Sequence, residues 1–228
     1  GKDSSMWKSI ESQISINSDV SLSAGNTGVL LIMSKMILKT LDGVDKPALA
    51  GLWTNKVNMN VVLDLGANVE CSEKNLVDFS EMGSALYQSL YPNDKAKVAL
   101  LNIGSEEIKG TELLKNTYSK LKILDKFGNF DFAGYIEGNQ ITDGKCNVIV
   151  TDGFTGNVAL KTAEGTANFL TQNLKQALSS NIFSKLSTIL SYFPLKKFKN
   201  KLDPRKYNGA IFLGLNGPVV KSHGSTDG

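Results

Sequence analysis

The feature that most constrains the fold of this chain is a repeated arrangement, in which a short apolar run is followed by a loop rich in Gly, Asn and Asp. It occurs five times, at Val20–Leu22, Val61–Leu65, Val98–Leu101, Val148–Val150 and Ile211–Leu215. Glycine lets backbone N–H groups approach a ligand closely, and a helix that begins behind such a loop adds the positive end of its dipole. Parallel strands would bring these loops to one edge of a sheet, where open α/β proteins bind phosphorylated ligands. The pattern therefore predicts an α/β protein that binds an anion.

Helical and extended patterns alternate along the whole chain. Apolar residues at helical spacing predict helices at Ser4–Ile16, Thr27–Thr40, Thr111–Leu124 and Val158–Leu178, and another that begins after Ser72 as its N-cap. Between them lie predicted strands at Val20–Ser23, Ala48–Trp53, Asn60–Leu65, Lys97–Ile103, Phe130–Ile136 and Asn147–Thr151. This alternation predicts a three-layer α/β/α fold with a mainly parallel sheet.

The domain organisation follows from the absence of linkers and repeats. We interpret residues 1–228 as a single α/β domain. The chain begins on a predicted helix without a preceding strand and stops in a loop of the kind that elsewhere opens a helix. We therefore expect it to be the larger part of a longer polypeptide.

Composition narrows the chemistry further. Cys71 and Cys146 lack the CxxC spacing, which favours a reducing compartment. With His223 as the single histidine, no metal site is expected, and Ser-His-Asp or Cys-His catalysis would depend on that residue alone. No apolar stretch reaches the length that spans a membrane.

The first glycine-rich loop, SAGNTG, covers Ser23–Gly28. It predicts a cradle for phosphate or for a thioester carbonyl, formed by Ser23, Gly25, Asn26 and Thr27 at a helix start. The alternative interpretation is a tight strand-to-helix turn that needs small residues.

Two later loops contain the candidate catalytic side chains. Lys109 ends the sequence NIGSEEIK, where its ammonium would hold phosphate or stabilise an oxyanion; the alternative is a solvated lysine paired with Glu106 or Glu107. In TDGFTGN, the amide of Asn157 would donate to negative charge in a transition state, or would only cap the helix. The same segment adds to the candidate phosphate site three further residues: Asp152, Gly156 and Lys161.

The remaining two loops supply supporting groups. In GANVE, we expect Asp64 and Asn68 to shape the rim by hydrogen bonding. In NGPVVKSHG, Asn216 and His223 are candidates for contact with substrate, although a lone histidine near a chain end is more often structural.

A basic amphipathic segment lies at residues 180–206. Its first apolar face, interrupted at Pro194, includes Leu186, Leu190 and Phe193, and its second face, which includes Phe198, is interleaved with lysines. A helical arm of this kind suits the surface of an anionic bilayer. The alternative is an arm that packs against a second subunit. Nucleic-acid binding is not expected, because no aromatic stacking platform accompanies the charge.

Taken in order, these loops resemble those of the bacterial phosphate acyltransferases of the PlsX family. The matching stretches include SAGNTG, VVLDLGANV, VALLNIGSEEIKG, VIVTDGFTGNVALKT, YNGAIFLGLNG and KSHGS, and the similarity extends from Ser4 to Gly228. The resemblance implies a fold like those of the phosphotransacetylases and isopropylmalate dehydrogenases. It also implies that Lys109 and Asn157 are catalytic, and that the basic arm is the family's membrane-associating segment.

The same resemblance implies the reaction and the partners. A cytoplasmic, peripherally membrane-associated homodimer would transfer a long-chain acyl group from acyl carrier protein to inorganic phosphate, without a cofactor. Its acyl phosphate product would feed a glycerol-3-phosphate acyltransferase in phospholipid synthesis. The family's N-terminal glycine-rich strand and final helix have no counterpart in this sequence.

The residues themselves favour direct attack of phosphate on the thioester, because no dependable nucleophile–base pair is present. Two rival functions remain open at this point. One is a phosphotransacetylase that uses acyl-CoA, and the other is a non-catalytic adaptor at a lipid surface. A Rossmann dehydrogenase is not favoured, since no GxGxxG opens a helix.

Overall fold

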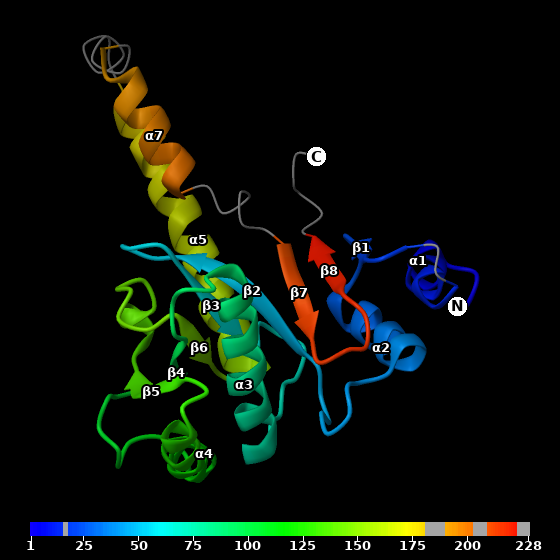
Figure 1. The fold of residues 1–228 in the computed structure, drawn as a ribbon. Helices are drawn as coiled ribbons and strands as arrows, with labels where there is room; N and C mark the ends of the chain where they lie inside the picture. Colours follow the sequence, from blue (N-terminus) through cyan, green and yellow to red (C-terminus); the bar gives the residue numbers. More distant parts are fainter. Residues whose placement is uncertain (16–17, 181–189, 203–208, 223–228) are drawn as a thin grey trace.

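The computed structural model describes residues 1–15, 18–180, 190–202 and 209–222. Its centre is one sheet of eight strands in the order β1-β8-β7-β2-β3-β6-β4-β5 (Figure 1). The strands are β1 (Ser21–Ser23), β2 (Ala48–Thr54), β3 (Met59–Leu63), β4 (Lys97–Leu101), β5 (Asp131–Ile136), β6 (Val148–Val150), β7 (Gly209–Leu213) and β8 (Val219–Ser222).

The directions of the strands divide the sheet into two parts. β3, β6, β4 and β5 are parallel neighbours and form one half. In the other half, β2 runs antiparallel to both β3 and β7, β7 runs antiparallel to β8, and β8 is parallel to β1. The sheet is therefore mixed, with β1, β8 and β2 opposed to the other five strands. The loops that join β2 to β3 and β7 to β8 are too short for the crossover that a parallel pair requires.

Helices cover both faces of this sheet, as the predicted three-layer fold requires. On one face lie α1 (Ser5–Ile14), α2 (Thr27–Leu38) and the first part of α5 (Gly153–Leu178), which pack against a core that includes Leu30, Val62, Ile149, Phe212 and Val219. On the other face, α3 (Glu73–Leu90) and α4 (Glu112–Leu124) pack against Leu63, Val98, Leu100, Val148 and Val150. Alternate residues of β3 and β6 thus enter opposite cores, because successive side chains of a strand point to opposite faces.

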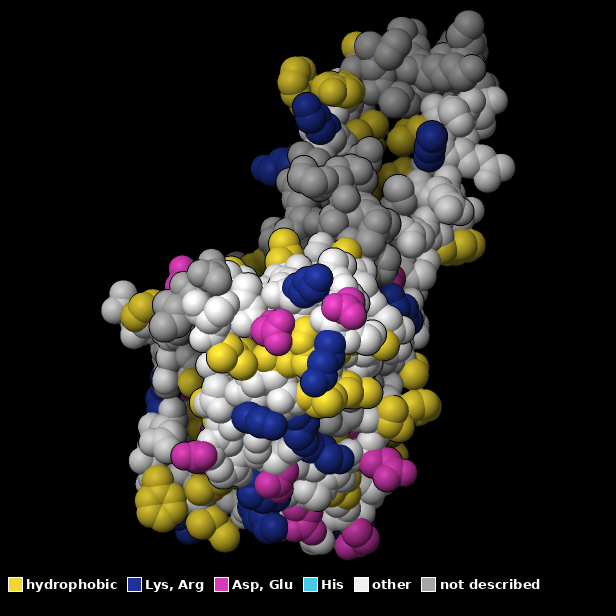
Figure 2. All heavy atoms as spheres, turned by 90° about the vertical axis from the view of Figure 1, so that its right-hand side faces the viewer, with side chains coloured by type: hydrophobic (Ala, Val, Ile, Leu, Met, Phe, Trp, Pro, Cys, Tyr) yellow, Lys and Arg dark blue, Asp and Glu magenta, His cyan; other side chains and the backbone are white. Residues whose placement is uncertain are grey.

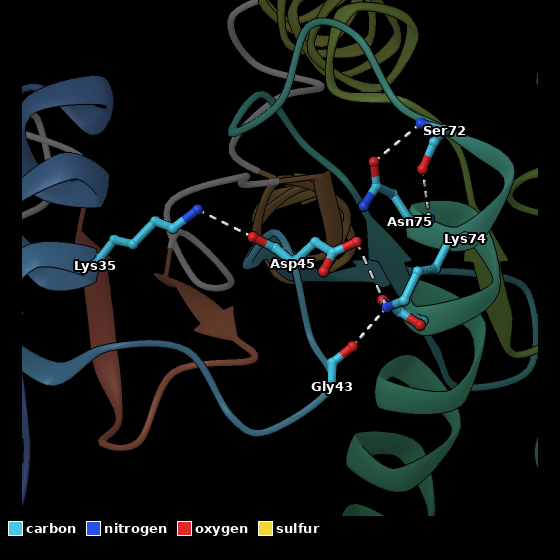
Figure 3. Close-up of polar contacts among 7 residues, drawn as sticks. Lys35, Gly43, Asp45, Ser72, Lys74 and Asn75 are labelled. Carbon is cyan, nitrogen blue, oxygen red and sulfur yellow. Dashed lines mark hydrogen bonds and ion pairs between the residues drawn. The ribbon is translucent and has the colours of Figure 1, made fainter.

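The loop between α2 and β2 is held by lysines from both helical layers (Figure 3). Lys35 of α2 donates to the backbone carbonyl of Asp45 at 3.0 Å, and Lys74 of α3 donates to the carbonyl of Gly43 at 2.5 Å. Ser72 is the N-cap of α3, as predicted, and it forms a capping box with Asn75. The loop therefore links the α2 layer to the α3 layer just before β2 begins.

A helical arm projects away from the sheet (Figures 1 and 2). It consists of the distal part of α5 and of α7 (Tyr192–Leu202). Beyond Gly156 no residue of α5 is buried, and Phe169, Leu170 and Leu174 are among its exposed apolar side chains. Pro194, predicted to interrupt the arm, lies in the first turn of α7, where a missing N–H breaks no intrahelical hydrogen bond. The arm thus begins within α5, earlier than residue 180.

The outer side of α2 is also apolar. Figure 2 shows apolar side chains and lysines gathered on this face of the molecule. Val29, Ile32 and Met36 are exposed there, and together with Trp7 of α1 they line a shallow hollow of about 290 Å³. In the described part of the chain, no helix has the length and apolar content needed to cross a lipid bilayer.

Candidate functional site

The candidate catalytic loops lie at one edge of the sheet, where the parallel strands β3, β6 and β4 end. These three strands are neighbours, so the loops GANVE, TDGFTGN and NIGSEEIKG follow one another along this edge. Asn157 follows β6 and Lys109 follows β4. The sequence prediction that these loops lie at one edge therefore holds for four of the five loops, these three and the loop after β7. The loop after β7 also lies at this end, because β7 runs in the same direction as β3.

Asp64 organises the loop that follows β3. Its carboxylate is fully buried and accepts hydrogen bonds from the backbone N–H groups of Leu49, Gly66, Ala67 and Asn68 at 2.7–3.2 Å, and from the Asn68 side chain at 2.8 Å. Burial raises the pKa of this carboxyl, and the backbone donors oppose that change. The prediction that Asp64 and Asn68 shape the rim is confirmed.

Asn157 lies in the second turn of α5 and faces the loop that Asp64 holds. The N-cap of this helix is Asp152, whose carboxylate accepts from the backbone N–H of Thr155 at 2.8 Å. The alternative interpretation of Asn157 as a cap is therefore wrong. The Asn157 amide instead donates to the carbonyl oxygen of Leu65 over a long 3.4 Å, and its side chain is exposed. One amide hydrogen thus remains for a ligand.

Two glycines make this approach possible. Gly66 has φ +124°, and a Cβ at this position would lie 2.8 Å from the Asn157 amide nitrogen. At Gly156, a Cβ would lie 1.9 Å from the carbonyl oxygen of Asp64. A side chain at either position would separate the start of α5 from the loop after β3. The placement of the Asn157 amide therefore depends on the close approach that these two glycines allow.

Lys109 is placed by the side chain of Asn102. The amide of Asn102, at the end of β4, donates to the carbonyl of Lys109 at 3.1 Å, and its oxygen accepts from the N–H of Ile103. The Lys109 ammonium lies 3.9 Å from Glu106 and remains half exposed, whereas Glu107 pairs with Lys122 and Tyr118. The alternative, in which Lys109 is a solvated lysine paired with Glu106 or Glu107, is thus supported only by the long contact with Glu106. Sequence reasoning did not single out Asn102.

Neither cysteine is a ready nucleophile. Burial raises the pKa of the half-buried Cys71 thiol to about 11, with a further increase from the charge of Asp64. Burial also raises the pKa of Cys146 to about 11. Because the thiolate is the reactive form, both side chains are almost wholly protonated near neutral pH.

Large exposed apolar side chains lie in the loops of this edge, close in sequence to the two candidate catalytic residues. Ile103 and Ile108, in the loop that contains Lys109, are 80% and 81% exposed. Phe154, in the first turn of α5, is 61% exposed, and Val69 projects from the GANVE loop. Exposed apolar side chains of this size offer a surface for an apolar group of a ligand.

The SAGNTG loop does not share this edge, which corrects the sequence prediction. It follows β1, and β1 runs opposite to β3, β6 and β4, so the loop lies at the other end of the sheet. Asn26 caps α2 by accepting from the N–H of Val29 at 3.1 Å, as the alternative interpretation of a strand-to-helix turn requires. Ser23, Gly25 and Thr27 consequently lie apart from Lys109 and Asn157. The predicted common pocket of all five loops is wrong.

Lys161 is an exposed lysine of α5. It lies one turn beyond Asn157 on α5 and forms an ion pair with Glu164 at 2.7 Å. Its charge also acts on Lys221 of β8, and Lys221 is paired in register with Ser23 of β1. Sequence reasoning did not predict β8, because the segment that contains it was interpreted as a loop.

The other predicted site residues have structural contacts or lie outside the described chain. Asn68 donates to the carbonyl of Pro47 as well as to Asp64, and Asn216 donates to the carbonyls of Leu38 and Thr40 at the end of α2. His223 and Leu186 lie outside the described residues. Leu190, Phe193 and Phe198 are exposed on the arm. Within the described ranges, no group of three acidic, Cys or His side chains could hold a metal ion.

Comparisons with known proteins place this geometry in a family. A family model described as fatty acid synthesis protein matches residues 1–228. The chain is 63% identical over 227 residues to a phosphate acyltransferase of Pelagibacter ubique, with 100% of this chain and 68% of that protein covered. It is 45% identical to a phosphate acyltransferase of Agrobacterium fabrum, with 98% and 63% covered. The chain thus spans roughly two thirds of the length of these relatives.

Solved structures share the fold at low sequence identity. The EutD phosphotransacetylase from Staphylococcus aureus matches with a TM-score of 0.61 at 15% identity, over 97% of this chain and 62% of that one. A phosphotransacetylase from Streptococcus pyogenes matches with a TM-score of 0.63 at 15% identity, over 96% and 62%. These likenesses confirm the α/β/α architecture that was predicted from the alternation of elements.

Proposed function

This chain belongs to the fatty acid synthesis protein family, and from that premise we propose that it transfers a long-chain acyl group from an acyl carrier protein thioester to inorganic phosphate. An oxygen of phosphate attacks the thioester carbonyl and forms a C–O bond. The tetrahedral intermediate then collapses with cleavage of the C–S bond. The products are acyl phosphate and the carrier thiolate, which takes up a proton.

The observation that supports this proposal is that Asn157 and Lys109 follow the neighbouring parallel strands β6 and β4. The amide hydrogen of Asn157 that is not directed at Leu65 would donate to the oxyanion of the intermediate. The ammonium of Lys109, held loosely by Glu106, would neutralise the incoming phosphate. Neither role requires the protein to form a covalent bond with the acyl group.

Direct attack is further supported by the state of the thiols. The raised pKa of Cys71 and Cys146, about 11 in each case, leaves almost no thiolate to form an acyl-enzyme. Phosphate is already a nucleophile at neutral pH. The protein then has only to position the two substrates and to stabilise the developing charge.

The acyl group and the membrane have separate candidate surfaces. Ile103, Ile108 and Phe154 border the catalytic edge and would contact the first part of the acyl chain. The arm presents Phe193 and Phe198 next to Lys196 and Lys197, which suits an anionic bilayer. We propose peripheral membrane association of a cytoplasmic homodimer, which would pass acyl phosphate to a glycerol-3-phosphate acyltransferase.

A second candidate function is that of a phosphotransacetylase that uses acyl-CoA. Two phosphotransacetylases share the fold of this chain, which is the reason to test this candidate. At 15% identity, that likeness concerns the fold alone. Donor choice separates the two, because the carrier-protein enzyme should turn over the acyl thioester of acyl carrier protein and fail with the free CoA thioester. A non-catalytic lipid-surface adaptor would bind vesicles and cleave neither thioester.

The experiment is a measurement of carrier thiol release by the purified chain with the long-chain acyl thioester of acyl carrier protein as donor. We expect release that depends on added inorganic phosphate and that yields acyl phosphate in equal amount. Thiol release without phosphate, or an acyl group retained on the protein, would contradict direct attack. Absence of any release from a folded chain, with vesicle binding intact, would favour the adaptor.

A further inference from the structure

The loop that carries Lys109 joins β4 to α4 and is mostly exposed. Residues 105–109 are exposed without interruption. The amide of Asn102 holds the base of the loop by donating to the Lys109 carbonyl, and the Lys109 N–H donates to the carbonyl of Glu106 at 3.0 Å. Segments with so few buried contacts open at a low cost in free energy. A definite position of the Lys109 ammonium therefore requires a further contact at the tip of the loop.

Glu107 provides that contact with α4. Its carboxylate accepts hydrogen bonds from the hydroxyl of Tyr118 at 2.6 Å and from the ammonium of Lys122 at 3.1 Å. Tyr118 and Lys122 are four residues apart on α4, so they lie on the same side of the helix. These donors lower the pKa of the Glu107 carboxyl, and hydrogen bonds to an ionised carboxylate are the stronger kind. Within the described ranges, no other side chain of residues 103–109 forms a hydrogen bond or an ion pair with another helix or strand.

The ring of Tyr118 packs in a fixed position against β5. Its centroid lies 5.1 Å from that of Phe132 and 4.9 Å from that of Tyr135. These two residues, three apart, face the same side because β5 has one more residue than β4 between them in the strand pairing. Gly134 lies in this bulge with φ +82°, and a Cβ there would be 3.4 Å from the Tyr118 ring. The hydroxyl of Tyr118 is thus held by the sheet and not by the loop.

We infer that Tyr118 is a positioning residue, which holds the tip of the loop through Glu107 and so fixes the place of the Lys109 ammonium. The inference rests on the proposed function for the role of Lys109 toward phosphate. Tyr118 itself needs no contact with substrate. It acts through one carboxylate, which connects the edge of the sheet to the loop.

The same contact determines which carboxylate Lys109 meets. Glu107 is engaged by Tyr118 and Lys122, and the ion-pair partner of Lys109 is Glu106 at 3.9 Å. A Glu107 carboxylate released from α4 would leave an unpaired negative charge two residues from Lys109. That charge would oppose the binding of an anion at the lysine.

The first experiment measures the loop without turnover. Tyr118→Phe keeps the ring and its packing on β5 but removes the hydroxyl. Hydrogen–deuterium exchange, followed by mass spectrometry of peptides, should accelerate about 3- to 10-fold in residues 103–110, because a bond to a charged group is lost at an exposed site. Peptides of α4 and β5 should be unchanged. Tyr91→Phe, which removes a phenol hydroxyl at the C-terminal end of α3, is the control, and unchanged exchange of the loop in Tyr118→Phe would overturn the inference.

The second experiment tests whether Tyr118 acts through Glu107. Exchange of the loop in the double variant Glu107→Ala with Tyr118→Phe should be no faster than in Glu107→Ala alone, since both changes remove one contact. Glu107→Gln keeps an oxygen that accepts from the hydroxyl, so it should restore most of the protection. Lys122→Gln should have the smaller effect, because an exposed ion pair contributes little. Additive acceleration in the double variant would overturn the route through Glu107.

Kinetics then test whether the position of Lys109 is what Tyr118 controls. Tyr118→Phe should raise KM for phosphate about 3- to 10-fold, with a smaller change in kcat, in proportion to the opening of the loop. In a Lys109→Ala background, the same change should have no further effect on kcat/KM, because the positioned group is absent. An equal further loss in that background, or an effect confined to KM for the acyl donor, would overturn the positioning role.

The two kinds of measurement keep the inference separate from the proposed function. If the chain proves inactive with its donor, the exchange experiments still decide whether Tyr118 and Glu107 hold the loop. Turnover that depends on Lys109 but not on Tyr118, with unchanged exchange of the loop, would reject the positioning role and leave the proposed function intact.

Discussion

The amide nitrogen of Asn157 lies 3.4 Å from the carbonyl oxygen of Leu65, above a glycine whose φ is +124°. This contact joins the second turn of α5 to the loop that ends β3. On the other side of that loop, the buried carboxylate of Asp64 holds the backbone N–H groups. The position of the proposed oxyanion donor is therefore determined by a loop and a helix that are distant in sequence.

Replacement of Asn157 by alanine tests the oxyanion role. We expect kcat to fall about 10²- to 10³-fold, since that is the usual effect of removing one oxyanion donor. The fold should be retained, because the side chain is exposed and its single hydrogen bond is long. Asn173→Ala, at an exposed position farther along α5, is the matched control. Phosphate-dependent thiol release and circular dichroism of both variants provide the measurement, and near-normal turnover of Asn157→Ala would reject the assignment.

Replacement of Lys109 tests the proposed phosphate contact. Lys109→Ala should lower kcat/KM for phosphate by about 10²-fold or more, because an ammonium near the reacting phosphate is lost. Stability should change by less than about 0.5 kcal/mol, since the lysine is exposed and its nearest carboxylate is 3.9 Å away. Lys126→Ala serves as the control. Equal loss of activity in the two variants would show that general charge, and not position, is responsible.

Gly66→Ala is expected to disturb both stability and catalysis. A Cβ would strain a backbone with φ +124° and would press on the Asn157 amide at 2.8 Å. The free energy of unfolding should fall by roughly 1–3 kcal/mol. Gly165→Ala, in the middle of α5 with open space around it, should instead raise stability by up to about 1 kcal/mol. Urea unfolding of the two variants compares them, and a neutral Gly66→Ala would contradict the described contact.

The arm should bind vesicles through its exposed aromatic side chains. Phe193→Glu combined with Phe198→Glu should weaken sedimentation with vesicles containing phosphatidylglycerol by at least tenfold, because apolar contact is lost and negative charge is added. Turnover of a soluble donor should be unchanged. Phe127→Glu, an equally drastic change at an exposed site beside α4, is the control. Vesicle binding that survives the double change would exclude these two residues as the anchor.

Alkaline pH should destabilise the protein through Cys146. Burial raises the pKa of this thiol to about 11, above its value in the unfolded chain near 9. The folded state therefore holds the proton more tightly, so this contribution is present below pH 9 and is lost as the pH rises from 9 to 11. The full difference corresponds to on the order of 2–3 kcal/mol. Urea unfolding at pH 8 and pH 10.5 under reducing conditions should show the decline, and Cys146→Ala should reduce it.

Local structure was predictable because it depends on local signals. The apolar runs became β2, β3, β4 and β6 within a few residues, and Ser72 capped α3 as expected. The direction of β1 was not predictable, since it pairs with β8 from the far end of the chain. The reversal at β2 and β3 did have a signal, because only Asn55–Asn58 separate the two strands and a parallel crossover needs a dozen residues or more.

The candidate site was predicted in the same uneven way. The parallel half of the sheet brings to one edge four predicted residues: Lys109, Asn157, Asp64 and Asn68. They lie there because the strands that precede them are neighbours, as the sequence pattern predicted. Asn26 and Asn216 were instead used at the two ends of α2, where backbone groups need side-chain partners. The strand β8 could not be recognised, because its pairing depends on β1 from the other end of the chain and on β7.

Helix α5 carries Asn157 near one end and Leu170 in its exposed distal half, without interruption. Thirteen residues of helix correspond to about 20 Å, which is less than the thickness of the hydrocarbon layer of a membrane. Acyl phosphate is a mixed anhydride that water can destroy. In the proposed function, with the outer half of α5 resting on lipid, this length would set how far the acyl phosphate travels and so the time in which hydrolysis competes with delivery.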